Sequence, residues 1–241
     1  MTPQNRIPEL DIMRGFCILS MIAVHLVYDL TELYSILRAP YPPFFLLVKN
    51  WGGIVFFLIS GISATLGRRS ARRGIIVLSC GMLVSAVTVL AGFLPIRFGV
   101  LHALGTCMLC WGGFKSASAN VLLFSGIGFC VLGWIFERCT VSAVFLYPLG
   151  LTAPGFESGD YFPLFPYLGY FLLGAYLGRR LYPHRKSLLP QYRFCTPVSR
   201  FLRLCGRHSL LLYLIHQPVL IFMIETVTFI GGVFHETSHG A

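Results

Sequence analysis

Residues 11–29 read Asp-Ile-Met-Arg-Gly-Phe-Cys-Ile-Leu-Ser-Met-Ile-Ala-Val-His-Leu-Val-Tyr-Asp, an apolar run that nevertheless contains Arg14, His25 and Asp29. Ionisable residues are costly inside a bilayer and therefore point to function. On an α-helix, Arg14 and His25 lie within about 20° of the same face and about 16 Å apart, and Asp29 follows His25 by one turn. The stretch predicts a transmembrane helix whose polar groups line a pathway or a buried reaction site.

The composition of the chain is that of a membrane protein. Of 241 residues, 56% are hydrophobic and only 12% are charged, and the mean hydropathy is +0.74. A soluble domain has about 25% charged residues. The formal net charge of +10 does not indicate a nucleic-acid partner, because the arginines cluster in short segments between apolar runs, as membrane topology requires. We therefore expect membrane lipids, and no nucleic acid, among the partners.

We expect an all-α, polytopic membrane bundle of about seven transmembrane helices, formed by a single domain over residues 1–241. A membrane span needs about 20 predominantly apolar residues. The candidate runs are residues 12–30, 44–66, 74–93, 98–114, 119–136, 161–178 and 208–230. The fourth and sixth of these runs are short.

The basic residues predict the orientation of these spans. Three basic loops fall on the same side as the N-terminus with Arg6: residues 68–73, 115–118 and 179–207. Loops rich in Lys and Arg stay in the cytoplasm, so we expect a cytoplasmic N-terminus and an external His239. The arginines, Arg68 and Arg69 among them, have a second interpretation as binding residues for an anionic cofactor that approaches from the cytoplasm.

The eight cysteines do not indicate a metal or redox site. Cys107 and Cys110 have the C-x-x-C spacing, but Leu104, Met108 and Trp111 surround them in a predicted span. We expect packing thiols there and no bound metal.

His25 and Asp29 form the first candidate site. A neutral imidazole at this depth can act as a general base, and a carboxylate one turn away can orient it and stabilise the imidazolium. The alternative is a histidine that hydrogen-bonds across helices as a packing residue, with Asp29 capping the helix end. Arg14 either reaches the lipid headgroups, pairs with Asp11 or binds a phosphate.

Three further motifs carry polar residues near predicted span ends. Arg97-Phe-Gly-Val-Leu-His102 places His102 in the outer half of the bundle, where it could line one cavity with His25. Asp160 precedes the sixth span, where a carboxylate either caps the helix start or contacts an outer substrate. His216 precedes Pro218, which frees a backbone carbonyl in the last span. His216 either satisfies that backbone or contributes to the site.

Four motifs resemble the bacterial heparan-α-glucosaminide N-acetyltransferase catalytic-domain family. They are Leu10-Asp-Ile-Met-Arg-Gly through His25, Arg97 through His102, Asp160-Tyr-Phe-Pro-Leu-Phe-Pro, and Gly206 through Pro218. They follow one another along nearly the whole chain. The spacing from Arg14 to His25 and the run Phe56-Phe-Leu-Ile-Ser-Gly also resemble the acyltransferase-3 family of membrane acyltransferases.

The resemblance implies an enzyme of the bacterial cytoplasmic (inner) membrane that moves an acetyl group from cytoplasmic acetyl-CoA to an extracytoplasmic sugar or glycan. In that enzyme His25 would take a proton from the acceptor. The expected roles are catalysis by His25, Asp29 and His102, donor binding by Arg14, Arg68 and Arg69, and acceptor binding by Arg97, Asp160 and His216. A proton-coupled transporter and a non-catalytic membrane subunit remain as alternatives, and the sequence leaves a homodimer open.

Overall fold

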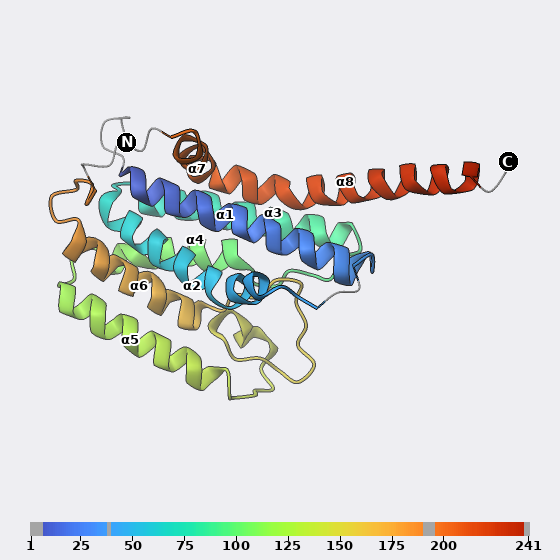
Figure 1. Ribbon diagram of the computed structural model, residues 1–241. Helices are drawn as coiled ribbons and strands as arrows, with labels where there is room; N and C mark the ends of the chain where they lie inside the picture. The colour runs from blue at the N-terminus through green and yellow to red at the C-terminus, as the bar shows by residue number, and fades with distance from the viewer. Residues whose placement is uncertain (1–6, 38–39, 190–195, 239–241) are drawn as a thin grey trace.

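The computed structural model describes residues 7–37, 40–189 and 196–238, and helices dominate these residues (Figure 1). Two isolated bridges, Phe98–Tyr161 and Thr140–Thr152, are the β pairings in the described part of the chain. The helices are α1 (Pro8–Tyr28), the π-helical turn η2 (Asp29–Leu33), α2 (Pro43–Leu66), α3 (Ser70–Leu90), α4 (Val100–Phe114), α5 (Ala119–Phe136), the 3₁₀ turn η3 (Val144–Leu149), α6 (Leu164–Leu181), α7 (Pro197–Arg207) and α8 (Ser209–Ser238). The predicted all-α class is confirmed.

The starts of several helices follow from local sequence chemistry. Pro8, Pro43 and Pro197 each occupy the first turn of a helix, where a missing backbone N–H costs nothing. The hydroxyl of Ser118 accepts a hydrogen bond from the backbone of α5, and that of Thr196 caps α7 in the same way. These signals fix where the chain enters each helix.

Five helices of the described chain are long and apolar enough to cross a membrane. They cover Pro8–Leu33, Pro43–Leu66, Ser70–Leu90, Ala119–Phe136 and Ser209–Ile230. The two short spans of the prediction are the ones outside this set. α4 is an apolar helix of only 15 residues, and α6 contains Arg179, Arg180 and three tyrosines among its 18 residues. The protein is therefore an integral membrane protein by its helices.

Three predicted span starts lie three or four residues from the observed helix starts, those of α1, α3 and α6, and the last two displacements have a local cause. α3 begins at Ser70, so Arg72 and Arg73 lie in its first turn and not in the loop before it. α6 begins at Leu164, after Pro163, because Asp160 belongs to a loop that folds back toward α4. The predicted sides of the two termini were stated for Arg6 and His239, and both residues lie outside the described residues.

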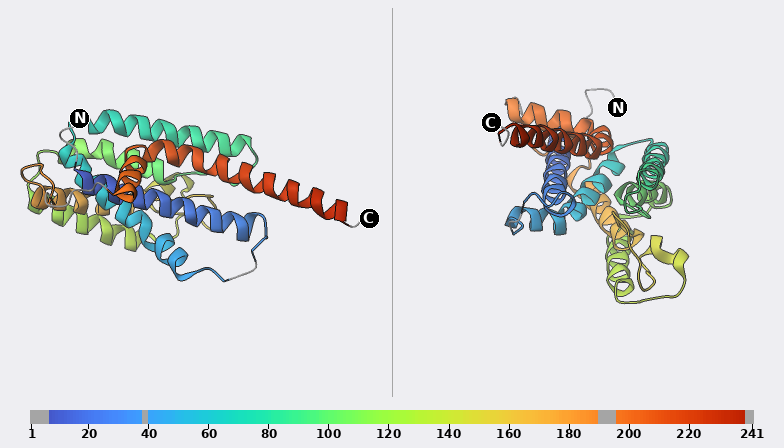
Figure 2. Two further views of the ribbon diagram at one scale, coloured as in Figure 1. Left: turned by 45° about the horizontal axis from the view of Figure 1, so that its top comes forward. Right: turned by 90° about the vertical axis from the view of Figure 1, so that its right-hand side faces the viewer.

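The helices pack in an order that differs from their order in the chain. α6 packs between α2 and α5, α3 pairs with α4, and α1 contacts α2, α7 and α8. α7 runs across the direction of the other helices, and α8 extends beyond their ends (Figures 1 and 2).

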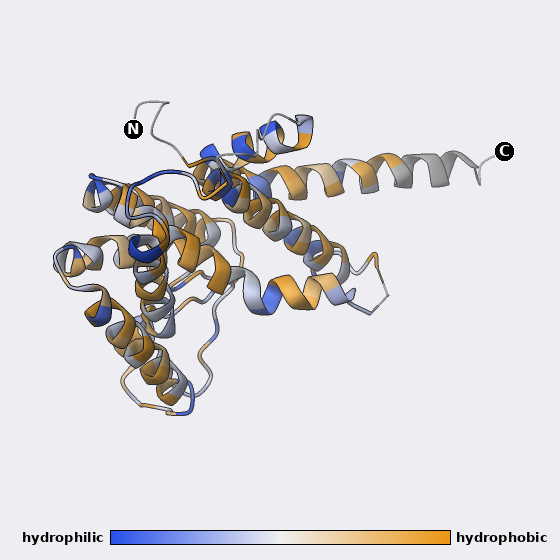
Figure 3. Ribbon diagram, turned by 60° about the vertical axis from the view of Figure 1, so that its left-hand side comes forward, coloured by the Kyte–Doolittle hydropathy of each residue, from blue (hydrophilic) through white to orange (hydrophobic). Residues whose placement is uncertain are grey.

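Successive loops alternate between the two ends of the bundle. One end, called here the basic end, is formed by residues 67–69, 115–118, 182–189 and 196–208, and the opposite end by residues 30–37, 40–42, 91–99 and 137–163 (Figure 1). Figure 3 shows hydrophobic residues along the helices and hydrophilic residues concentrated near their ends and on α7. The described parts of the three basic loops therefore lie at one end of the bundle.

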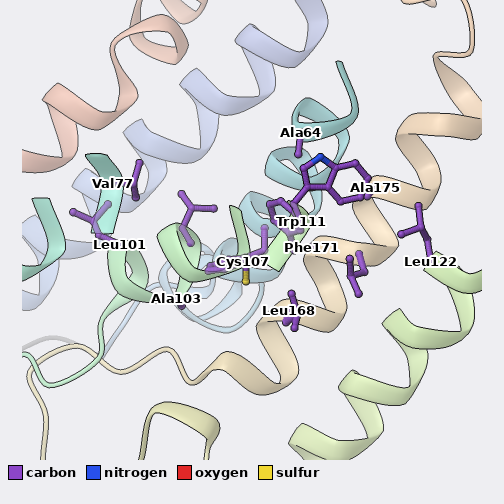
Figure 4. Close-up of a cluster of buried hydrophobic side chains, with 13 residues drawn as sticks. Ala64, Val77, Leu101, Ala103, Cys107, Trp111, Leu122, Leu168, Phe171 and Ala175 are labelled. Carbon is purple, nitrogen blue, oxygen red and sulfur yellow. The ribbon is translucent and has the colours of Figure 1, made fainter. Parts of the chain in front are cut away.

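The buried core lies where α2, α4 and α6 meet (Figure 4). Phe57, Cys107 and Phe171 have no exposed surface, and the rings of Trp111 and Phe171 lie 6.5 Å apart between centroids. Cys107 is thus a packing thiol, as predicted.

Close contact between α1 and α7 depends on two glycines. A Cβ atom at Gly15 would collide with the backbone oxygen of Leu202, and one at Gly206 with the backbone oxygen of Asp11. Small residues that let helix backbones approach are the usual means of helix association in membranes. α7 is therefore fastened to the N-terminal half of α1.

We expect Gly15→Ala and Gly206→Ala each to lower the free energy of unfolding by about 1–3 kcal/mol, because each methyl group would push two backbones apart. Thermal unfolding in detergent measures the effect. Gly112→Ala is the matched control, since nothing lies within 4 Å of a Cβ atom there. Equal melting temperatures for all three variants would contradict this account of the interface.

Candidate functional site

His25 of α1 and His216 of α8 face each other. Their ring centroids lie 4.9 Å apart in an edge-to-face arrangement, at an interplanar angle of 64°. Nδ1 of His216 lies 2.5 Å from the backbone oxygen of Tyr213. Nε2 of His216 is buried and has no hydrogen-bond partner among the described residues. Two half-buried imidazoles from different helices thus meet at the contact between α1 and α8.

Asp29 pairs with α8 and not with His25. Its side chain is enclosed, with 1% of the residue exposed, and Nε2 of Gln217 lies 3.0 Å from both carboxylate oxygens. The expected hydrogen bond from His25 is not present in the described structure. The physical reason is that α8 lies against this part of α1 and brings an amide donor to the carboxylate. Asp29 also starts the π-helical turn, a feature that often occurs at functional sites.

Asp160 caps α4, whereas the sequence placed it at the start of α6. Its Oδ2 accepts a hydrogen bond from the backbone N–H of Val100 at 3.0 Å and one from the hydroxyl of Tyr213 at 3.4 Å. A Cβ atom at Gly99 would collide with this carboxylate, so the glycine makes room for it. Burial raises the pKa of Asp160 to about 6. The residue joins the 137–163 loop to α4 and α8.

His102 lies in α4 and is not in contact with His25. Only 4% of it is exposed, and its Nδ1 accepts a hydrogen bond from the N–H of Gly99 at 3.3 Å. Its ring lies against Phe98 and packs on Gly81 of α3. The structure thus places His102 as a capping residue at the start of its own helix. The described residues show no contact between His102 and His25 of the kind expected if they lined one cavity.

Arg97 is exposed at the opposite end and holds the neighbouring loop. Its Nε donates to the backbone oxygen of Glu157 at 3.1 Å, its backbone N–H donates to Ser158, and its guanidinium lies 5.8 Å from the ring centroid of Phe156.

Tyr213 connects Asp160 with His216. Its hydroxyl binds Asp160, its backbone oxygen accepts from His216, and the rings of Tyr213 and His216 lie 5.4 Å apart. We call the set His25, Asp29, Asp160, Tyr213, His216 and Gln217 the polar seam. The sequence had selected four of these residues. Tyr213 and Gln217 were missed as site residues, although Tyr213 is three residues before His216 and four before Gln217, spacings that make side chains neighbours on a helix surface.

Arg14 lies at the other end of α1, near the basic end. Its Nη2 donates to the hydroxyl of Ser63 on α2 at 2.6 Å, and its Nη1 lies 3.4 Å from Asp11. Arg207 of α7 lies 3.5 Å from the same carboxylate. Arg14 therefore joins α1 to α2, next to the contact between α1 and α7.

Two cavities open at the basic end of the described structure. One has a volume of 620 Å³ and is lined by Arg68, Trp111, Lys115, Arg179, Tyr182 and Arg185, among others. The second, of 870 Å³, is lined by Arg68, Arg69, Arg72, Arg73, Arg185 and Lys186, among others. Arg68 and Arg185 are common to both. Arg179 also donates to the carbonyl groups at the end of α4, so part of this charge is structural. No polar-seam residue lines either cavity.

The raised pKa of Asp160 makes a prediction for stability. A folded-state pKa of about 6, above the ordinary 3.8, means that the folded protein binds more protons than the unfolded chain between these values. Stability should therefore fall as the pH rises through this interval. In detergent, we expect the melting temperature of the wild type to be higher at pH 5 than at pH 7. This difference should exceed the corresponding difference for Asp160→Asn by a few degrees. The same pH response in both proteins would contradict the assignment.

The comparisons with known proteins agree with the motifs in this site. The profile described as heparan-alpha-glucosaminide N-acetyltransferase, catalytic, matches residues 6–218, which include every residue of the polar seam and both basic cavities. Neither the curated proteins nor the solved structures gave a match. The chain therefore belongs to the heparan-α-glucosaminide N-acetyltransferase catalytic family.

Proposed function

We propose that the protein transfers an acetyl group from acetyl-CoA, bound at the basic end, to a sugar or glycan at the opposite end. The observation that carries the proposal is the meeting of His25 and His216 at the contact between α1 and α8, in a chain of an acetyltransferase family. Buried ionisable groups in membrane helices are expensive and are kept where they have a task.

The proposal includes a topology. α4 and α6 lie alongside the five long helices (Figure 1), and counted with them they give seven crossings. The positive-inside rule then assigns the basic end and the N-terminus to the cytoplasm of a bacterial inner membrane. The opposite end, with Arg97 and Asp160, faces the extracytoplasmic side, where it would receive the acceptor.

The donor site is supported by the charge around the two cavities. Coenzyme A carries several phosphate charges, and guanidinium groups bind phosphate through paired hydrogen bonds. Arg68, Arg69 and Arg185 line this entrance. From Arg14 to His25 the rise along α1 is about 16 Å, and the pantetheine arm of the donor would have to cover this distance between the helices.

The chemistry belongs to the two imidazoles and their neighbours. One neutral imidazole accepts the proton of the acceptor hydroxyl or amine while that atom attacks the thioester carbonyl carbon. A donor near the same place stabilises the oxyanion that forms. Asp29, held by Gln217, supplies a negative charge beside the imidazolium. His102 holds the first turn of α4, to which Asp160 of the polar seam is bound.

We expect His25→Ala to lower acetyl transfer to glucosamine by at least about 100-fold, because it removes one of the two imidazoles that form the reaction site, and loss of an acid–base group or of its direct neighbour has this order of effect. The melting temperature and the binding of acetyl-CoA should stay near the wild-type values. His208→Ala is the control, since His208 is an exposed histidine at the junction of α7 and α8. Full activity of His25→Ala would end the proposal, and solute uptake driven by a pH gradient without thioester cleavage would favour a transporter.

The double variant Arg68→Ala/Arg69→Ala should weaken acetyl-CoA binding about tenfold and reduce its dependence on salt, because exposed charges interact through a screened field. A thermal-shift titration with acetyl-CoA measures both effects. Arg138→Ala is the matched control: Arg138 is an exposed arginine at the opposite end, stacked on Trp134. Equal losses in the two proteins would show that net charge, and not the basic end, governs binding.

A further inference from the structure

Two buried hydrogen-bond acceptors of the polar seam lack partners. Nε2 of His216 and Oε1 of Gln217 are enclosed and make no hydrogen bond within the described residues. They belong to consecutive residues of α8: His216 faces His25 of α1, and Gln217 donates to Asp29, the first residue of η2. A buried acceptor without a donor is unfavourable, so such a pair marks a place where a ligand with O–H or N–H groups would be stabilised.

The geometry fixes which atoms of His216 and Gln217 are acceptors. A carbonyl oxygen can only accept, so Nδ1 of His216, 2.5 Å from the oxygen of Tyr213, must carry the ring hydrogen. In the neutral ring, Nε2 then holds the free lone pair. Carboxylate oxygens likewise only accept, so the amide nitrogen of Gln217 must face Asp29, and its oxygen must point elsewhere. Neither orientation depends on a ligand.

We infer that Nε2 of His216 takes the proton from the nucleophilic hydroxyl or amine of the acceptor, and that Oε1 of Gln217 accepts a hydrogen bond from a second donor of the same molecule. This inference rests on the proposed function and assigns roles within it. The acceptor class is a molecule with two neighbouring O–H or N–H donors, as in a polyol or an amino sugar. Tyr213 is then the positioning residue that holds the tautomer of His216.

The step balances with His216 as the proton carrier. The nucleophilic oxygen or nitrogen forms a bond to the thioester carbonyl carbon, and its proton moves to Nε2 of His216. The carbon–sulfur bond then breaks, and the thiolate of coenzyme A leaves with the proton that His216 returns. The products are the acetylated acceptor and free coenzyme A, and the histidine ends in its starting state. His25 keeps the neighbouring position, beside the reacting thioester.

His216→Asn is the variant that separates base from packing. The asparagine amide can still donate to the oxygen of Tyr213, but it offers no basic nitrogen at the position of Nε2. With radiolabelled acetyl-CoA and glucosamine, we expect kcat to fall at least 100-fold, while acetyl-CoA binding and the melting temperature change little. His208→Asn serves as the control, because His208 is an exposed histidine at the junction of α7 and α8.

Chemical rescue covers the case in which the substitution disturbs folding. Added imidazole should restore part of the turnover of His216→Ala, as it would not for a residue that only fills space. Gln217→Leu should raise the KM for glucosamine about tenfold while the KM for acetyl-CoA stays within twofold.

The outcomes distinguish this inference from the proposed function. Wild-type turnover in His216→Asn, together with an inactive His25→Ala, would overturn the assignment to His216 and leave the acetyltransferase proposal standing. An inactive His216→Ala that imidazole does not restore would also overturn it. Wild-type turnover in His25→Ala would instead remove the proposed function on which the inference rests.

Discussion

The hydrogen bonds from Gln217 to Asp29 hold the last helix against the first. In the interior of a membrane bundle a carboxylate has no water to solvate it, and a partner from another helix must supply the donors. Here one amide nitrogen serves both carboxylate oxygens at 3.0 Å. This contact places Tyr213, His216 and Gln217 beside α1, and the candidate site exists only where the two helices meet. The site is therefore a property of the α1–α8 interface and not of one helix.

The helices could be predicted from the sequence because apolar length, prolines and capping residues are local signals. The first span, the helix at 43–66 and the helix at 119–136 were placed within four residues at every boundary. The starts of α3 and α6 differ from the predicted ones by four and three residues, because arginine and aspartate residues can lie inside a helix turn or in a loop, and only tertiary contacts decide between these.

The residue types of the site could be predicted, but their partners could not. His25, Asp29 and His216 stand out because ionisable groups are rare in apolar runs. The helix spacing of His25 and Asp29 suggested that they pair, yet a residue 188 positions away takes the carboxylate. In the same way Asp160 caps a helix that begins 60 positions earlier, and not the one that follows it. Such pairings depend on how distant helices cross, which no local pattern in a single sequence records.

The extension of α8 beyond the other helices has a consequence for the setting of the site. Its 30 residues span about 45 Å, whereas the hydrocarbon layer of a bilayer is about 30 Å thick. An upright α8 would leave a third of its length outside the lipid, and a tilted one would bring more of it inside. Because His216 and Gln217 belong to this helix, its tilt sets how deep they lie. Lipid acyl-chain length is thus a variable that acts on the depth of His216 and Gln217.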